Sequence, residues 1–162
     1  MPDAAPFVIR RATEKDVPAL GRLGALLMRT HYAFDPQRFL APGAGAEAGY
    51  GRFLGSQLDE DDSAVFVAEK DGAVIGYVFA GLEPMSWREL RDACGFIEDV
   101  AVEEVGRRLG IANALIEAAI DWLRSRGAPR VMLWTADKNN AAQRLFDRLG
   151  FRRTMVEMTR EL

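Results

Sequence analysis

The chain has 162 residues, of which 49% are hydrophobic and 28% are charged, which is ordinary for a soluble globular protein and argues against intrinsic disorder. A net charge of −3 gives no electrostatic reason to expect nucleic acid or an anionic membrane as a partner. Its single cysteine, Cys94, excludes an internal disulfide framework, and no apolar run approaches the length of a membrane span, so we expect one cytoplasmic domain over residues 1–162.

The first half of the chain predicts a strand, two helices and a hairpin. A capping signature, Thr13-Glu-Lys-Asp16, precedes the first helical pattern, and an Asp71-Gly72 pair between two apolar runs is typical of a tight turn. We expect a strand at residues 7–11, a helix from 16 to 28 or beyond and a second helix at 46–58. We also expect a connection rich in aromatic residues that begins at 31–36, and hairpin strands at 64–70 and 73–82.

The second half predicts strands that alternate with helices. We expect an irregular linker at residues 83–94, a strand at 95–102, a helix that starts at 111 and ends before 127, a short strand buried on both faces at 131–135, a helix at 137–149 and a last strand at 151–160. Period-2 alternation in the strand at 95–102 places Phe96, Glu98, Val100 and Val102 on one face. This order of elements indicates a mixed α/β sheet with helices on both faces.

The turn between the strand at 95–102 and the following helix contains two arginines and two glycines, Arg107, Arg108, Gly106 and Gly110. A helix start leaves backbone N–H groups without intrahelical partners, and the helix dipole favours an anion beside them. Guanidinium groups are suited to phosphate oxygens, so the turn predicts a pyrophosphate site. A Walker A loop is excluded because Gly110 is followed by Ile111 rather than by lysine, and the Gly-x-Gly-x-x-Gly fingerprint of a Rossmann fold is absent.

Two motifs resemble those of the Gcn5-related N-acetyltransferase (GNAT) family. Arg107-x-x-Gly110-x-Ala112 is similar to the family's acyl-coenzyme A motif, Gln/Arg-x-x-Gly-x-Gly/Ala. Residues 139–151 are similar to its Asn-x-x-Ala-x-x-x-Tyr-x-x-x-Gly-Phe segment, with Phe146 in place of the usual tyrosine. The order of elements also matches the family's fold, so the resemblance covers nearly the whole chain.

The resemblance implies a fold and a co-substrate. The fold would be the GNAT fold, an α/β fold with a mixed, mostly antiparallel sheet of about six to seven strands, helices on both faces and a splayed central strand pair. Acetyl-CoA would be the co-substrate, without a metal, and its pantetheine arm would lie between the splayed strands. The residues implied to bind it are Val100, Ala101, Val102, Arg107, Arg108, Leu109, Gly110, Ile111, Ala112, Asn113, Asn139 and Phe146. For Asn139, a helix cap is an equally weighted alternative.

The chemistry implied by the resemblance is direct attack of an amine on the thioester in a ternary complex. Glu98 is the candidate general base, directly or through water, and its alternatives are a substrate-binding or a structural carboxylate. Asp99 is expected on the opposite strand face in a structural role. The family's tyrosine hydroxyl is taken as the general acid, and Phe146 lacks it, so water or another group replaces it or the protein binds acyl-CoA without turnover. Tyr32, Tyr50 and Tyr77 are the alternative hydroxyls, and an apolar stripe is the alternative role for Phe146.

The sequence carries two conflicting signals about the acceptor. We expect an acetyltransferase that acts on a primary amine of a small molecule or peptide, with residues 31–38 and 83–94 shaping the acceptor site. Four acidic residues favour a polyamine or lysine-like amine: Glu83, Asp92, Glu98 and Asp99. Arg88, Arg91 and Trp87 instead favour a substrate that also bears a carboxylate. The alternative function is a non-catalytic acyl-CoA sensor or partner-binding module. A homodimer is one possible oligomeric state. Cys94 is interpreted as a structural thiol, because the sequence supplies no base for a nucleophile.

Overall fold

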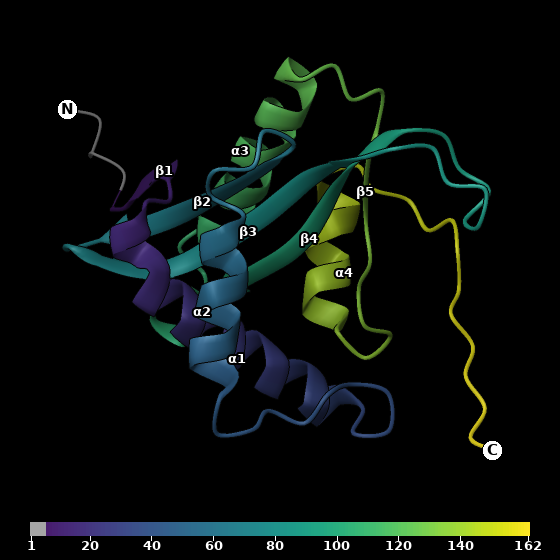
Figure 1. Ribbon diagram of the computed structural model, residues 1–162, viewed down its shortest axis with the longest axis horizontal. Helices are drawn as coiled ribbons and strands as arrows, with labels where there is room; N and C mark the ends of the chain where they lie inside the picture. Colours follow the sequence, from purple (N-terminus) through teal and green to yellow (C-terminus); the bar gives the residue numbers. More distant parts are fainter. Residues whose placement is uncertain (1–5) are drawn as a thin grey trace.

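A mixed sheet forms the centre of the computed structural model, which describes residues 6–162 (Figure 1). Within these residues the sheet has five strands in the order β1-β2-β3-β4-β5: β1 (Val8–Arg11), β2 (Ser63–Lys70), β3 (Ala73–Glu83), β4 (Cys94–Val102) and β5 (Val131–Leu133). Neighbours from β1 to β4 are antiparallel, and β4 and β5 are parallel. The mixed, mostly antiparallel sheet is confirmed, but the strand number is lower than the six to seven expected.

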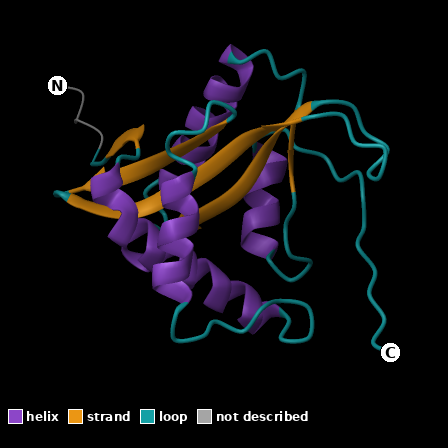
Figure 2. Cartoon of the chain, viewed as in Figure 1, coloured by secondary structure: helices purple, strands orange, loops and turns teal. Residues whose placement is uncertain are grey.

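Helices cover both faces of the sheet, as predicted (Figure 2). They are α1 (Val17–Phe34), α2 (Ala46–Ser56), α3 (Ile111–Ser125) and α4 (Asn140–Arg148). Leu20 of α1 and Leu54 of α2 are fully buried against strand residues such as Tyr77 on one face. Leu115 of α3 is fully buried against residues such as Val78 on the other face, where α4 also packs. No helix in the described part of the chain has the length and apolar character needed to cross a membrane.

The first helix begins where the capping signature predicted and extends beyond Met28 into the segment that was expected to be a connection. The Asp16 carboxylate accepts a hydrogen bond from the backbone amide of Thr13 at 2.8 Å and pairs with Arg10 at 2.8 Å. Because the guanidinium of Arg10 stabilises the ionised form, the pKa of Asp16 lies below its ordinary value. At the other end, α1 continues to Phe34, so His31 lies on a helix and not in a connection.

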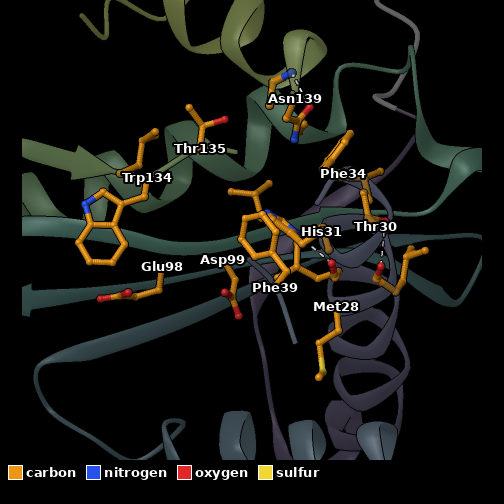
Figure 3. A pocket seen from close by; sticks show the side chains of 18 of the residues that line it. Met28, Thr30, His31, Phe34, Phe39, Glu98, Asp99, Trp134, Thr135 and Asn139 are labelled. Atoms are coloured by element: carbon orange, nitrogen blue, oxygen red, sulfur yellow. Dashed lines mark hydrogen bonds between the residues drawn. The ribbon is translucent and has the colours of Figure 1, made fainter. Parts of the chain in front are cut away.

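Strand β4 contains a bulge that the sequence did not predict. Phe79 of β3 pairs with Asp99, and its neighbour Ala80 pairs with Ile97, so Glu98 is an additional residue. The expected alternation is therefore wrong beyond this point: Phe96 and Val100, predicted on one face, lie on opposite faces. Glu98 and Asp99, predicted on opposite faces, point to the same side of the strand (Figure 3).

The parallel neighbours β4 and β5 diverge after a short contact. Their pairing runs only from Gly95 with Val131 to Ile97 with Leu133. The splayed central pair is thus confirmed. The expectation of a strand buried on both faces at 131–135 is wrong, because β5 ends at Leu133, is half-buried, and is followed by an exposed Trp134.

The C-terminal segment, residues 151–162, forms no strand, which corrects the prediction of a last strand at 151–160. It runs as an extended chain away from the sheet (Figure 1). Side chains tie it to the rest of the molecule through an ion pair of Arg38 with Glu157 and a hydrogen bond from Arg153 to Gln143. A strand needs a partner for its backbone groups, and this segment has none among residues 6–162. This difference accounts for part of the lower strand number.

Candidate functional site

A large cleft of about 1260 Å³ lies where β4 and β5 diverge. Residues of α1, α2 and their connecting loop form one wall, β4 and β5 contribute the centre, and the start of α4 forms the other wall. Figure 3 shows Glu98 and Asp99 side by side, with His31 to their right and Asn139 above them. The predicted site residues that line the cleft are Glu98, Val100, Ala101, Val102, Arg107, Ala112, Asn139 and Phe146. Three separate sequence segments therefore meet in one cavity.

The predicted residues that do not line the cleft lie in the turn before α3 and in its first turn: Arg108, Leu109, Gly110, Ile111 and Asn113. The side chain of Ile111 is buried in the core, and Gly110 is the left-handed residue, with a φ of 79°, from which the helix starts. Within the described residues, no backbone amide from Arg108 to Asn113 donates a hydrogen bond. A run of unpaired amides at a positive helix end is suited to a phosphate anion, and Arg107 adds a cation at the cleft.

One edge of β4 is uncovered along the cleft. On its other edge, Val100, Ala101 and Val102 pair with β3 residues 78, 77 and 76. Because β5 pairs with β4 only as far as Ile97, no described strand pairs with the cleft side of β4 beyond that residue. An extended ligand that carries amide groups can add to such an edge in the manner of a further strand.

The Glu98 carboxylate has a strongly altered acidity. Partial desolvation, repulsion by the nearby carboxylates of Glu83 and Asp99, and a hydrogen bond with Glu83 together raise its pKa to about 7. The side chain remains accessible to solvent at the bulge. A carboxylate with a pKa near neutrality can accept a proton at physiological pH and release it again.

The Asp99 carboxylate lies beside Glu98 and accepts hydrogen bonds from two tyrosines. The hydroxyl of Tyr50 on α2 donates at 2.7 Å, and the hydroxyl of the buried Tyr77 donates at 2.9 Å. Burial raises the pKa of Asp99, although the two hydrogen bonds act in the opposite direction. The same burial, together with the Asp99 charge, raises the pKa of both tyrosines. The pairing is possible because Gly24 on α1 leaves room for the ring of Tyr50, which a methyl group at Gly24 would overlap.

Asn139 and Phe146 of the second motif both reach the cleft. The side-chain oxygen of Asn139 accepts from the backbone amide of Ala142 at 3.2 Å, so this residue caps α4. Phe146 packs against the core on the α3 side and against Phe151, with ring centroids 5.9 Å apart. Of the three alternative hydroxyls, Tyr50 and Tyr77 bond to Asp99, and Tyr32 does not line the cleft.

Sequence reasoning missed how many aromatic side chains line the α1 and α2 side of the cleft. His31, Phe34 and Phe39 lie there together. Their spacing along the chain was the only signal in the sequence that could have indicated this. The linker at 83–94, which was expected to shape the site, contributes no residue to the cleft. Arg91 in this linker instead pairs with Glu89 at 2.6 Å.

Two further observations concern the cysteine and possible metal ligands. Cys94 is buried and lies outside the cleft, and burial raises the pKa of its thiol, which is consistent with its interpretation as structural. Among residues 6–162 no group of three or more histidine, cysteine or acidic side chains is arranged to hold a metal ion.

Comparison with known proteins gives one matching family. A family model described as the acetyltransferase (GNAT) family matches residues 26–151. A mycothiol acetyltransferase of Thermomonospora curvata is 34% identical over 98 residues, which cover 60% of this chain and 31% of that protein. An N-alpha-acetyltransferase of Sulfurisphaera tokodaii is 34% identical over 110 residues, covering 64% of this chain and 65% of the relative. The chain thus spans only about a third of the length of the first of these relatives.

Solved structures share the fold. A mutant of the BH1408 protein of Bacillus halodurans superposes with a TM-score of 0.82 at 21% identity, covering 96% of this chain and 99% of that chain. The aminoglycoside N-acetyltransferase AAC(6')-Iy in complex with CoA superposes with a TM-score of 0.73 at 21% identity, covering 100% of this chain and 98% of that chain. At these identities the likeness concerns the fold alone.

Proposed function

The chain belongs to the acetyltransferase (GNAT) family, and from this we propose that it transfers an acetyl group from acetyl-CoA to a primary amine of a small molecule or peptide. One observation carries the proposal: a carboxylate with a pKa of about 7 and an uncovered strand edge line one cleft, and the run of unpaired amides adjoins it at Arg107 and Ala112. The names of relatives, an N-alpha-acetyltransferase and an aminoglycoside N-acetyltransferase bound to CoA, agree with an amine acceptor. We treat residues 1–162 as one N-acetyltransferase domain.

Acetyl-CoA would be held by backbone groups more than by side chains. The amides of Arg108 to Asn113 would donate to its pyrophosphate, with Arg107 beside them. The uncovered edge at Val100 to Val102 would bind the pantetheine amides, with Asn139 and Phe146 on the facing wall. When bound, this co-substrate supplies an activated thioester carbonyl.

Glu98 would remove the proton that prevents an ammonium group from attacking. Above pH 7 its carboxylate is mostly ionised, so it can accept this proton directly or through a water molecule. Asp99 would draw the cationic amine toward the same place, since its carboxylate lies on the same side of β4. The side chain of Phe146 cannot protonate the departing thiolate, and the hydroxyls of Tyr50 and the buried Tyr77 bond to Asp99, so we propose that water protonates it.

A non-catalytic acyl-CoA sensor is the second candidate, and the observation that favours it is Phe146, which lacks the hydroxyl of the family motif. Release of coenzyme A should be followed for the purified protein with acetyl-CoA, with and without each member of a panel of primary amines. Amine-dependent release supports the transferase. Tight acetyl-CoA binding with no release in the presence of any amine supports the sensor and overturns the transferase.

We further propose that the protein forms a homodimer. The support is the C-terminal segment, which exposes Met155, Val156 and Met158 at 80% or more of their surface. Soluble proteins commonly cover such side chains by association. Sedimentation or light scattering tests this, and removal of residues 155–162 should then yield a monomer. A full-length protein that is monomeric at all concentrations contradicts it.

A further inference from the structure

The cleft has an aromatic wall on its α1 and α2 side, which we define as His31, Phe34, Phe39, Tyr50 and Phe53. The ring of His31 contacts Phe39 edge-on with centroids 5.0 Å apart, and Tyr50 contacts Phe53 at 5.9 Å. Among the described residues, Phe34, Phe39 and Phe53 belong to neither buried core cluster. These rings are therefore placed around the cleft without being needed to fill the core.

Polar groups on this side of the cleft are already engaged. The Thr30 hydroxyl donates to the carbonyl of Leu26 at 2.8 Å, and Nδ1 of His31 donates to the carbonyl of Leu27 at 2.9 Å. The guanidinium of Arg38 pairs with both carboxylate oxygens of Glu157. In the described part of the chain, this side of the cleft offers no uncommitted cation for a substrate carboxylate.

Two carboxylates lie on the β4 side of the same space. Glu98 and Asp99 lie next to each other there, and both accept rather than donate when ionised (Figure 3). One anionic end and apolar walls together match a molecule with one cationic end and an apolar body. A second ammonium group at the aromatic wall would lose its hydration, a cost that attraction to the ring faces offsets only in part. A carboxylate beside the amine would meet two like charges.

We propose that the preferred acceptor is a small primary amine with an apolar, aromatic body, with no carboxylate beside the amine and no second cationic group. The inference rests on the proposed acetyl transfer and selects among its substrates. It resolves the conflict between acidic and basic residues in the sequence, because Arg88 and Arg91 belong to a linker outside the cleft.

Steady-state kinetics with four amines test the proposal: phenethylamine, ethylamine, phenylalanine and putrescine. The specificity constant kcat/KM for phenethylamine should exceed that for ethylamine by roughly tenfold or more, the scale expected for burying a phenyl group. Phenylalanine, which adds only a carboxylate to phenethylamine, should fall well below it. Putrescine carries a second ammonium in place of the phenyl group, and its kcat/KM should also fall well below that of phenethylamine.

The wall is tested by Phe34→Ala and Phe39→Ala, which should each reduce the preference for phenethylamine over ethylamine, measured as the ratio of their specificity constants. Trp87→Ala is the matched control, because Trp87 is 82% exposed on the linker and should leave the ratio unchanged. The dissociation constant of acetyl-CoA and the melting temperature report whether each variant is folded. If one phenylalanine variant does not fold, the ratio measured for the other variant decides the test.

Faster turnover of putrescine or phenylalanine than of phenethylamine would overturn the acceptor class and leave acetyl transfer standing. An undiminished preference for phenethylamine in both folded wall variants would also overturn it. If acetyl-CoA binds but none of the four amines nor any member of the wider panel is acetylated, the proposed function fails, and this inference fails with it.

Discussion

Replacing Glu98 by Gln separates proton removal from the shape of the cleft, because the amide keeps the size of the side chain and cannot ionise. With a pKa of about 7, roughly a tenth of Glu98 is ionised one pH unit lower. If Glu98 is the base, kcat/KM of the wild type should therefore fall about tenfold per unit below pH 7. Glu98→Gln should lower kcat roughly 10²-fold or more.

Initial rates of coenzyme A release from about pH 5 to about pH 9 measure this profile. Glu83→Gln is an informative second variant, because repulsion by Glu83 and its hydrogen bond both raise the pKa of Glu98. Its acidic limb should move to lower pH, whereas the dissociation constant of acetyl-CoA should change little in either variant. An acidic limb at the same pH in Glu98→Gln as in the wild type would refute the role of Glu98 as the base.

The same ionisation predicts a stability effect of known sign. The folded pKa of about 7 lies above the ordinary glutamate value of 4.5 expected in an unfolded chain, so the folded state binds more protons between these values. The free energy of unfolding should therefore decrease as pH rises through this window. Glu98→Gln should remove part of this decrease, which melting temperatures at about pH 5 and about pH 8 would detect.

Three further substitutions test other parts of the site. Gly110→Asp should abolish calorimetrically detectable acetyl-CoA binding, because it adds bulk and negative charge at the unpaired amides, whereas Gly127→Asp, at a similarly left-handed glycine after α3, should not. Phe146→Tyr should be tolerated, because its side chain lines the cleft, and should speed turnover if thiolate departure is limiting; a loss of roughly 1–3 kcal/mol of stability would instead show a dry core. Gly24→Ala should cost roughly 1–3 kcal/mol, because its methyl group overlaps an aromatic ring of α2, whereas Gly49→Ala, which meets no atom within 4 Å, should be neutral or stabilising in urea unfolding.

Local signals in the sequence predicted most of the fold. The Asp71-Gly72 pair has φ angles of 51° and 79° and joins β2 to β3 in the predicted hairpin. The capping signature at Thr13 to Asp16 precedes α1, and the motif around Gly110 is the start of α3. These features depend on neighbouring residues, so a pattern of a few positions is sufficient to identify them.

Features that depend on distant partners were not predictable. The bulge at Glu98 is defined by its pairing with β3, and the side-chain pattern of β4 gives no sign of an additional residue. As a result, Asp99 was expected on the wrong face and its two tyrosine partners were missed. Residues 151–162 have strand-like composition, but a strand also requires a partner edge. The aromatic wall was not predictable for the same reason. His31 and Phe34 lie on a helix only because α1 continues to Phe34.

The central claim is that an amine attacks acetyl-CoA directly while both occupy the cleft, and initial-velocity kinetics with both substrates varied test it most directly. For phenethylamine and acetyl-CoA, double-reciprocal plots should give intersecting lines, as expected when both substrates must be bound before the acetyl group moves. Parallel lines, which indicate a covalent acetyl-enzyme, or a rate of coenzyme A release that does not depend on the amine, would contradict the claim.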